Sequence, residues 1–136
     1  MSESDRNALQ DVMLRYAAGV DDRDMALYRS CFADDVTVVG MSEAPVEGAD
    51  AWLSFVEAAL ENYSATQHML GPQLATVDGD RASTRNDVQA LHELKAAPDT
   101  LFVLWATYLT DMQRIDGEWK IVRHELVRRT TETRKR

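Results

Sequence analysis

The sequence predicts an α+β domain in which helices from the first half of the chain cover one face of an antiparallel sheet built from the second half. Apolar residues recur every three or four positions in residues 4–20 and again from Asp50 to Leu60, as on amphipathic helices. From Thr66 onward the period changes to two, and two glycine-containing sequences typical of hairpin turns divide the strands. These turn sequences are Asp78-Gly79-Asp80 and Ile115-Asp116-Gly117. Helices followed by a long, bent sheet favour a layered domain that encloses a pocket.

The first predicted helix covers residues 4–20, with Ser4 as its N-cap. Its apolar stripe consists of Leu9, Val12, Met13, Tyr16, Ala17 and Val20. A second short helix is expected from Met25 to about Phe32, with Asp24 as its cap. Asp21 then lies at the end of the first helix, where the macrodipole disfavours a carboxylate. It therefore needs a local turn bond or a cationic partner.

Residues 36–39 are β-branched and short, which predicts a strand. The segment 41–47 contains Pro45 and is expected to be a mobile loop. A third helix begins at Asp50. Its apolar positions are Trp52, Phe55, Val56, Ala59 and Leu60.

Three long strands are predicted at about 81–95, 100–115 and 118–129. Alternation on the first of them places Asn86 and His92 on its buried face. Residues 101–109 are apolar on both faces, so each face is covered either within the subunit or by a second copy. We expect a homo-oligomer, a dimer or trimer.

The composition fits one domain spanning residues 1–136, with a core at about 5–128 and a basic tail at 129–136. The tail is expected to be solvated and partly disordered, although it could instead contact an acidic partner. The net charge of −8 disfavours nucleic acid and acidic membranes, and a small neutral substrate is easier to accommodate. No apolar run is long enough for a membrane helix, the N-terminus lacks signal-peptide features, and Cys31 stands alone. These features indicate the cytoplasm.

His68 is the leading catalytic candidate, because it is one of only three histidines and lies where the helical part gives way to strands. The competing interpretation is a hydrogen-bonded core histidine, which is commoner for a lone buried imidazole. No third ligand at a recognisable spacing accompanies His68 and His92, so no metal is predicted. There is also no glycine-rich phosphate loop and no exposed nucleophile, and we expect no cofactor.

The order of several motifs across residues 5–128 resembles one family. They are Tyr16 with Asp21 and Asp24, Phe32 with Asp34-Asp35, Thr66-Gln67-His68 with Gly71, the two turn sequences, and Trp119-Lys120-Ile121. The sequence is thereby similar to the SnoaL-like branch of the nuclear-transport-factor-2-like (NTF2-like) superfamily. Within that branch it is closest in pattern to scytalone dehydratase, with hexachlorocyclohexane dehydrochlorinase and bile-acid 7α-dehydratase as further relatives. The resemblance implies a cone-shaped, cystatin-like α+β fold with a pocket between sheet and helices.

Carried over by position, the resemblance implies catalytic roles for Asp21, His68 and His92, and it places Tyr16 within reach of the pocket. On the penultimate strand the sequence departs from scytalone dehydratase, since Ala106 and Tyr108 replace a serine and an asparagine. The same substrate is therefore not implied, although the acid–base residues remain.

His68 suits a general base, or a base that then acts as an acid, and Asp21 would fix its tautomer. His92 would protonate the leaving group or polarise a carbonyl. Tyr16 or Tyr108 would donate a hydrogen bond to a developing oxyanion.

Two further side chains are candidates for substrate binding. Asn86 either orients substrate or is a satisfied core amide, and Trp105 either packs in the core or forms a pocket wall. Arg123 and His124 point to opposite faces of the last strand, so at most one of them faces the pocket.

Three functions remain open. The first is a cofactor-independent lyase, a dehydratase or dehydrohalogenase acting on a small, largely apolar cyclic molecule. The second is an isomerase or polyketide cyclase with the same pocket. The third is a non-catalytic ligand-binding or assembly domain, for which a filled pocket and separated Asp21 and His68 would be expected.

Overall fold

The computed structural model describes residues 1–136 and contains three helices and seven strands. The helices are α1 (Glu3–Asp21), α2 (Met25–Arg29) and α3 (Ala49–Leu60). The strands are β1 (Phe32–Val39), β2 (Val46–Glu47), β3 (Tyr63–Leu70), β4 (Leu74–Asp78), β5 (Arg81–Leu94), β6 (Thr100–Ile115) and β7 (Glu118–Lys135).

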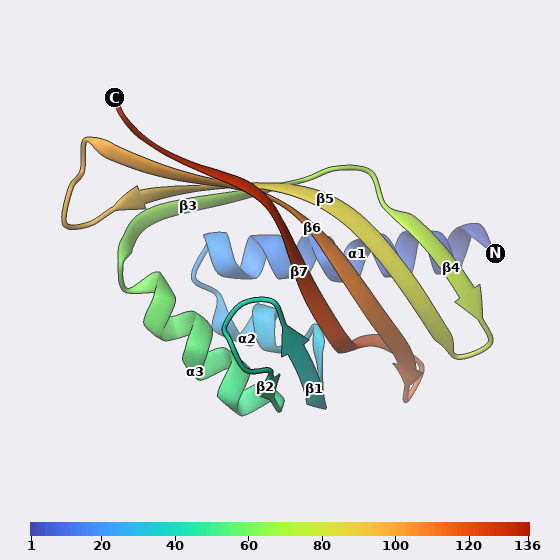
Figure 1. Ribbon diagram of the computed structural model, residues 1–136. Helices are drawn as coiled ribbons and strands as arrows, with labels where there is room; N and C mark the ends of the chain where they lie inside the picture. Colours follow the sequence, from blue (N-terminus) through green and yellow to red (C-terminus); the bar gives the residue numbers. More distant parts are fainter.

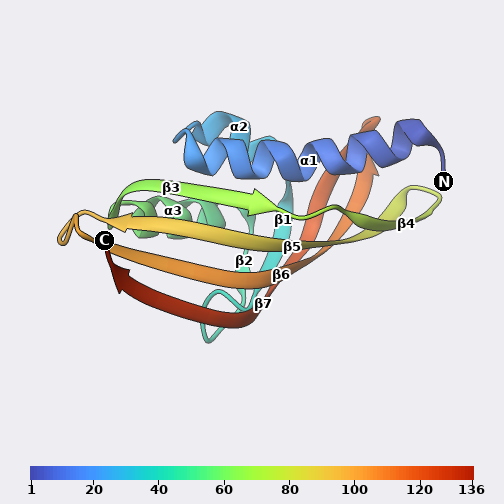
Figure 2. The same cartoon turned by 90° about the horizontal axis from the view of Figure 1, so that it is seen from above.

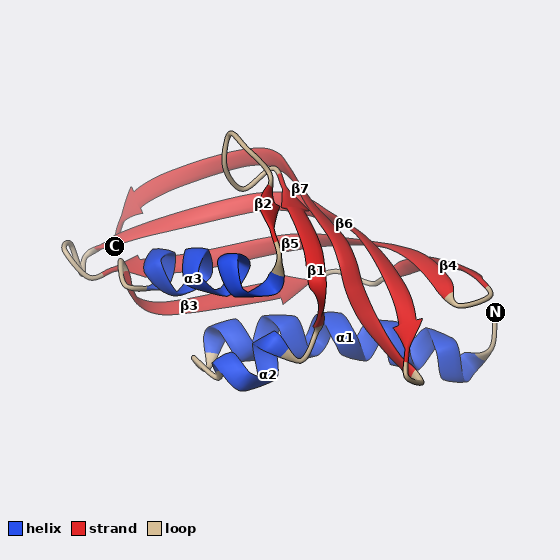
Figure 3. Ribbon diagram, turned by 90° about the horizontal axis from the view of Figure 1, so that it is seen from below, coloured by secondary structure: helices blue, strands red, loops and turns tan.

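The strands form one sheet in the order β2-β1-β7-β6-β5-β3, with β4 paired to β5 beyond the end of β3. All pairs are antiparallel except β1 with β7. The sheet is strongly curved, and all three helices lie on its concave side (Figures 1 and 2). Helix α1 packs along β3 at one edge of the sheet, whereas α3 packs mainly against β1 and β2 (Figure 3). The predicted α+β layered architecture is therefore confirmed.

The local sequence signals account for most element boundaries. Both predicted turn sequences join consecutive strands, β4 to β5 and β6 to β7. Asp24 caps α2 as predicted, its carboxylate accepting a hydrogen bond from the Leu27 amide at 3.0 Å. The N-cap of α1 is Ser2 rather than Ser4, because the Ser2 hydroxyl accepts from the Asp5 amide. Helix α2 is shorter than predicted, since Phe32 already begins β1.

The basic tail differs from its prediction. Strand β7 does not end at residue 129 but continues to Lys135, antiparallel to the beginning of β6, where Thr100 pairs with Lys135. Lys135 also forms an ion pair with Asp99 across this end of the sheet. Backbone pairing with β6 thus orders residues that the charge run alone predicted to be partly disordered.

The core lies between α1 and the concave face of the sheet. Leu9, Val12 and Met13 on α1 are fully buried, as the predicted stripe requires. They pack in a cluster with Val36 and Ile121 from the sheet. No helix is both long and apolar enough to cross a membrane.

Gly19 permits the close approach of α1 and α2. A Cβ atom at this position would lie 2.8 Å from the Tyr28 backbone nitrogen and 2.9 Å from its Cα. We expect Gly19→Ala to lower the free energy of unfolding by about 1–3 kcal/mol, because both clashing atoms are backbone and cannot rotate away. Chemical denaturation measures the change. Helix propensity alone favours alanine by about 1 kcal/mol, so a net gain in stability would show that the helices separate freely.

Candidate functional site

A cavity of about 160 Å³ lies between the helices and the concave face of the sheet. Fifteen residues from all three helices, from β3, β5, β6 and β7, and from the loop after β1 line it, and thirteen of them are hydrophobic. The other two are His68 and His92. An apolar cavity of about 150 Å³ is known to hold benzene, so the space fits a molecule with a single ring.

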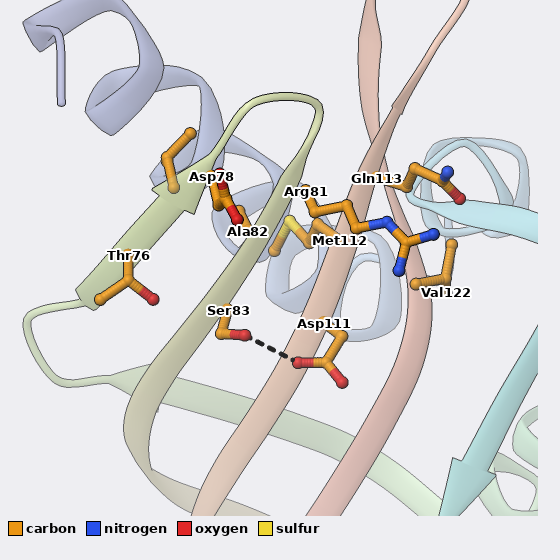
Figure 4. A pocket seen from close by; sticks show the side chains of 10 residues that line it. Thr76, Asp78, Arg81, Ala82, Ser83, Asp111, Met112, Gln113 and Val122 are labelled. Atoms are coloured by element: carbon orange, nitrogen blue, oxygen red, sulfur yellow. Dashed lines mark hydrogen bonds between the residues drawn. The ribbon is translucent and has the colours of Figure 1, made fainter.

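The larger hollows on the molecule have a different character. The one shown in Figure 4, of about 410 Å³, lies on the surface between the ends of β4, β5 and β6. Two of its polar side chains bond to each other, Ser83 donating to Asp111 at 3.0 Å. None of the three histidines lines it. The apolar cavity lined by His68 and His92 is therefore the candidate site.

Asp21 and His68 meet at the edge of this cavity. Asp21 is the last residue of α1, and His68 lies on β3, which passes beside the end of that helix. The His68 ring nitrogen Nδ1 lies 2.8 Å from Asp21 Oδ1, and the His68 backbone N–H donates to Asp21 Oδ2 at 2.7 Å. Because a carboxylate only accepts, Nδ1 carries the hydrogen and Nε2 is left as the basic nitrogen.

Thr66 completes the hydrogen bonding of the carboxylate. Its hydroxyl donates to Asp21 Oδ1 at 3.0 Å, so Asp21 accepts three hydrogen bonds. Partial burial raises the pKa of Asp21, but the bonds from His68 and Thr66 together outweigh that effect and hold the pKa below its ordinary value. Asp21 is therefore a carboxylate at neutral pH, as its proposed role requires.

His92 lies on β5 beside His68, with 6.0 Å between the ring centroids. Its Nδ1 is 3.1 Å from the Phe102 carbonyl oxygen, which can only accept, so Nδ1 again carries the hydrogen. Burial lowers the pKa of His92, and the bond to Phe102 only partly offsets this. His92 forms no bond with its neighbour Glu93, which bonds to Ser64 and Arg136 instead.

Three tyrosines, Tyr16, Tyr28 and Tyr108, form one cluster within the aromatic wall of the cavity, which Trp52, Phe55 and Tyr63 complete. Tyr16 packs against both of the others, with ring centroids 4.9 Å and 5.4 Å apart. Burial raises the pKa of all three well above the ordinary value, so they stay protonated. The predicted proximity of Tyr16 and Tyr108 to the pocket is thus observed, whereas Tyr28 had not been singled out.

Of the neighbouring residues Arg123 and His124 on β7, His124 is the one that faces the interior. Arg123 is exposed and pairs with Glu125, while His124 is completely buried behind Tyr16 and Tyr108. Its Nε2 is 3.0 Å from the Tyr16 hydroxyl and its Nδ1 is 3.0 Å from the Thr110 hydroxyl. Burial lowers the pKa of His124 to about 3, so the ring is neutral.

Two predicted substrate-binding residues lie outside the cavity. Asn86 is on the inner face, but its amide donates to the Gly71 carbonyl and accepts from Gln73, so it is a satisfied core amide. Trp105 points to the opposite face of β6 from Leu104 and lines a separate hollow with Arg85, Asp87 and Arg129. Trp105 was predicted to bind substrate, but successive side chains on β6 point to opposite faces of the sheet, so Leu104 rather than Trp105 reaches the cavity.

Clusters of three or more His, Cys, Asp or Glu side chains arranged to hold a metal ion are absent. The sequence pointed to Thr66 only as part of a motif. Its role as a donor to Asp21 follows from its position two residues before His68 on β3, which turns both side chains to the same face of the strand.

The oligomeric state stays a prediction.

Residues 2–125 match the SnoaL-like domain model. Uncharacterized proteins from Mycobacterium tuberculosis and Mycobacterium bovis are 30% identical to the chain over 126 residues, which is 88% of this chain and 82% of theirs.

Solved structures with the same fold include three informative neighbours. A Kribbella flavida protein is 25% identical, with a TM-score of 0.88 over 96% of this chain and 94% of its own. A type 2 hexachlorocyclohexane dehydrochlorinase is 22% identical, with a TM-score of 0.87 over 96% and 89%. A Novosphingobium aromaticivorans protein proposed to be a scytalone dehydratase is 23% identical, with a TM-score of 0.85 over 95% and 90%. The solved structures show that the chain has an NTF2-like, cystatin-like fold, and the match of residues 2–125 to the family model shows that it belongs to the SnoaL-like family.

Proposed function

We propose that the protein is a cofactor-independent lyase that eliminates water or halide from a small, largely apolar molecule with a single ring. The observation that carries this proposal is the Asp21–His68 pair at the edge of a cavity in which His68 and His92 are the only lining residues that are not hydrophobic. The bond to Asp21 fixes the tautomer of His68, and the apolar walls exclude water, so His68 is suited to remove a proton from carbon.

In the proposed reaction, His68 Nε2 takes a proton from a ring carbon. The electrons of that C–H bond form the new C=C bond, and the leaving group departs from the neighbouring carbon with the electrons of its own bond. Asp21 stabilises the imidazolium through the Nδ1–H bond of 2.8 Å. When the leaving group is hydroxide, the imidazolium returns the proton to give water. When it is halide, the proton passes to solvent.

The geometry of His92 changes the role expected for it. With Nδ1–H bonded to Phe102 and its pKa lowered, His92 is neutral and presents Nε2 to the cavity as a hydrogen-bond acceptor. A neutral acceptor cannot protonate a leaving group, but it can bind and orient a hydroxyl of the substrate. This favours dehydration of a hydroxylated ring over loss of halide.

The non-catalytic alternative expected a filled pocket and separated Asp21 and His68. The cavity and the 2.8 Å contact between the two side chains support catalysis instead. The isomerase alternative shares the same base, and product analysis separates it from the lyase.

The test uses a panel of hydroxylated and chlorinated six-membered rings, with products followed by NMR and mass spectrometry in ²H₂O. We expect a product lighter by one water for a hydroxylated ring, and no turnover by His68→Gln. Gln67→Ala is the matched control, because the neighbouring exposed side chain points to the other face of β3. A product of unchanged mass would support the isomerase, and saturable binding without conversion would support the ligand-binding domain.

A further inference from the structure

Arg23 has an unusual backbone conformation directly after α1. Its φ angle of 57° lies in the left-handed region, which non-glycine residues seldom occupy. This turn directs the guanidinium back toward the helix end, where Nη1 donates to the Val20 carbonyl at 2.6 Å and to the Thr66 hydroxyl at 2.8 Å. Arg23 forms no ion pair with any carboxylate, although Asp22 and Asp24 flank it in the sequence.

The bond to Thr66 has only one allowed direction. A guanidinium only donates, so Thr66 Oγ1 must accept from Arg23. The single hydroxyl hydrogen of Thr66 is then directed to Asp21 Oδ1, 3.0 Å away. Arg23 thereby fixes the orientation of a hydroxyl that bonds directly to the proposed catalytic carboxylate.

Arg23 also supplies the cation that the end of α1 lacks. The last turn of α1 contains no basic residue, yet Asp21 adds a negative charge to the negative end of the macrodipole. The Arg23 guanidinium bonds a carbonyl of this same turn. It therefore offsets the repulsion that otherwise acts on the Asp21 carboxylate.

We propose that Arg23 is a positioning residue that acts through Thr66 to hold the Asp21 carboxylate in place against His68. This inference rests on the proposed function for its kinetic consequences but not for its structural ones. Loss of Arg23 leaves the Thr66 hydroxyl free to rotate away from Asp21. The Asp21 carboxylate then stabilises the His68 imidazolium that forms during turnover less well, which lowers kcat more than it changes KM.

The test is a double-mutant cycle with Arg23→Gln and Thr66→Val. We expect each single change to lower kcat about three- to tenfold, the size of one hydrogen bond, with KM nearly unchanged. In the Thr66→Val background, Arg23→Gln should have a smaller effect than in the wild type, because the hydroxyl through which it positions Asp21 is gone and only its charge at the helix end is still lost. Thr66→Ser, which keeps the hydroxyl, should retain wild-type kcat.

The matched control is Arg29→Gln. Arg29 likewise donates to a backbone carbonyl, that of Phe32, near the end of a short helix, but its other bond is to Asp34 and not to Thr66. Its replacement should leave kcat unchanged. Equal losses of kcat from Arg23→Gln in the wild-type and Thr66→Val backgrounds would overturn the proposal.

A readout without substrate separates this proposal from the proposed function. Titration of the Asp21 carboxyl carbon by NMR should show a higher pKa for Asp21 in both single variants than in the wild type, because each weakens the bond from Thr66. An unchanged pKa of Asp21 in both variants would contradict positioning by Arg23 even in an active enzyme. A raised pKa without turnover of any ring in the panel would leave the positioning intact and count against the lyase.

Discussion

Replacement of Asp21 by asparagine should lower kcat by about 10²- to 10⁴-fold. The carboxylate accepts from two donors of the same residue, the ring Nδ1–H and the backbone N–H of His68, through different oxygens. An asparagine has only one acceptor oxygen, so in either amide orientation one of these donors faces an NH₂ group. The ring can escape by moving its hydrogen to Nε2, which places the wrong nitrogen toward the substrate.

The measurement is kcat at saturating substrate, with thermal unfolding to show that the variant is folded. His68→Gln should cause a loss at least as large, and the double variant should be no worse than His68→Gln alone, because the two side chains act as one unit. Asp22→Asn is the matched control, since Asp22 is the exposed neighbour of Asp21. An Asp21→Asn enzyme that keeps more than a tenth of wild-type kcat would contradict the proposed base.

The parts of the fold that were predictable have local causes. The stripe on α1 and the turn sequences before β5 and β7 each follow from residues close together in the chain. The short strand β2 was missed, because two residues cannot establish a period. The extension of β7 to Lys135 depends on pairing with residues of β6 that are distant in sequence.

The features of the site that the sequence could not predict also depend on residues that are distant in the chain. Asp21 and His68 were placed together only through the family resemblance, since 47 positions separate them. Trp105 lies in a stretch that is apolar on both faces, so alternation could not assign its side. The inward direction of His124 depends on a register shift between β6 and β7 near Val122, where Asp111 pairs with Arg123 but Met112 pairs with Ile121. Such a bulge leaves no clear sequence signal.

Acidification should destabilise the fold well above the pH at which carboxylates are protonated, because His124 is buried in its neutral form. Its pKa is about 3 in the folded protein, whereas an unfolded histidine has a pKa of about 6.5. Above pH 6.5 both states carry the neutral ring and the stability is fully present. Below that pH only the unfolded state binds the proton, so the free energy of unfolding falls by about 1.4 kcal/mol per pH unit. Urea denaturation at pH 6.5 and 4.5 should therefore differ by about 2–3 kcal/mol from this residue.

The pH window separates His124 from the other groups with shifted pKa values. Asp21 also has a lowered pKa, but its contribution is lost only as the pH falls below the ordinary carboxyl range of about 4. His92 titrates in the same window and in the same direction, although its bond to Phe102 opposes the burial effect, so its share is expected to be smaller. His124→Gln keeps a side chain able to bond the Tyr16 hydroxyl and should flatten the pH dependence by about one proton, whereas His92→Gln should flatten it less. Wild-type stability that stays constant between pH 6.5 and 4.5 would show that His124 accepts a proton within the folded protein, and that its bonds to Tyr16 and Thr110 open to water.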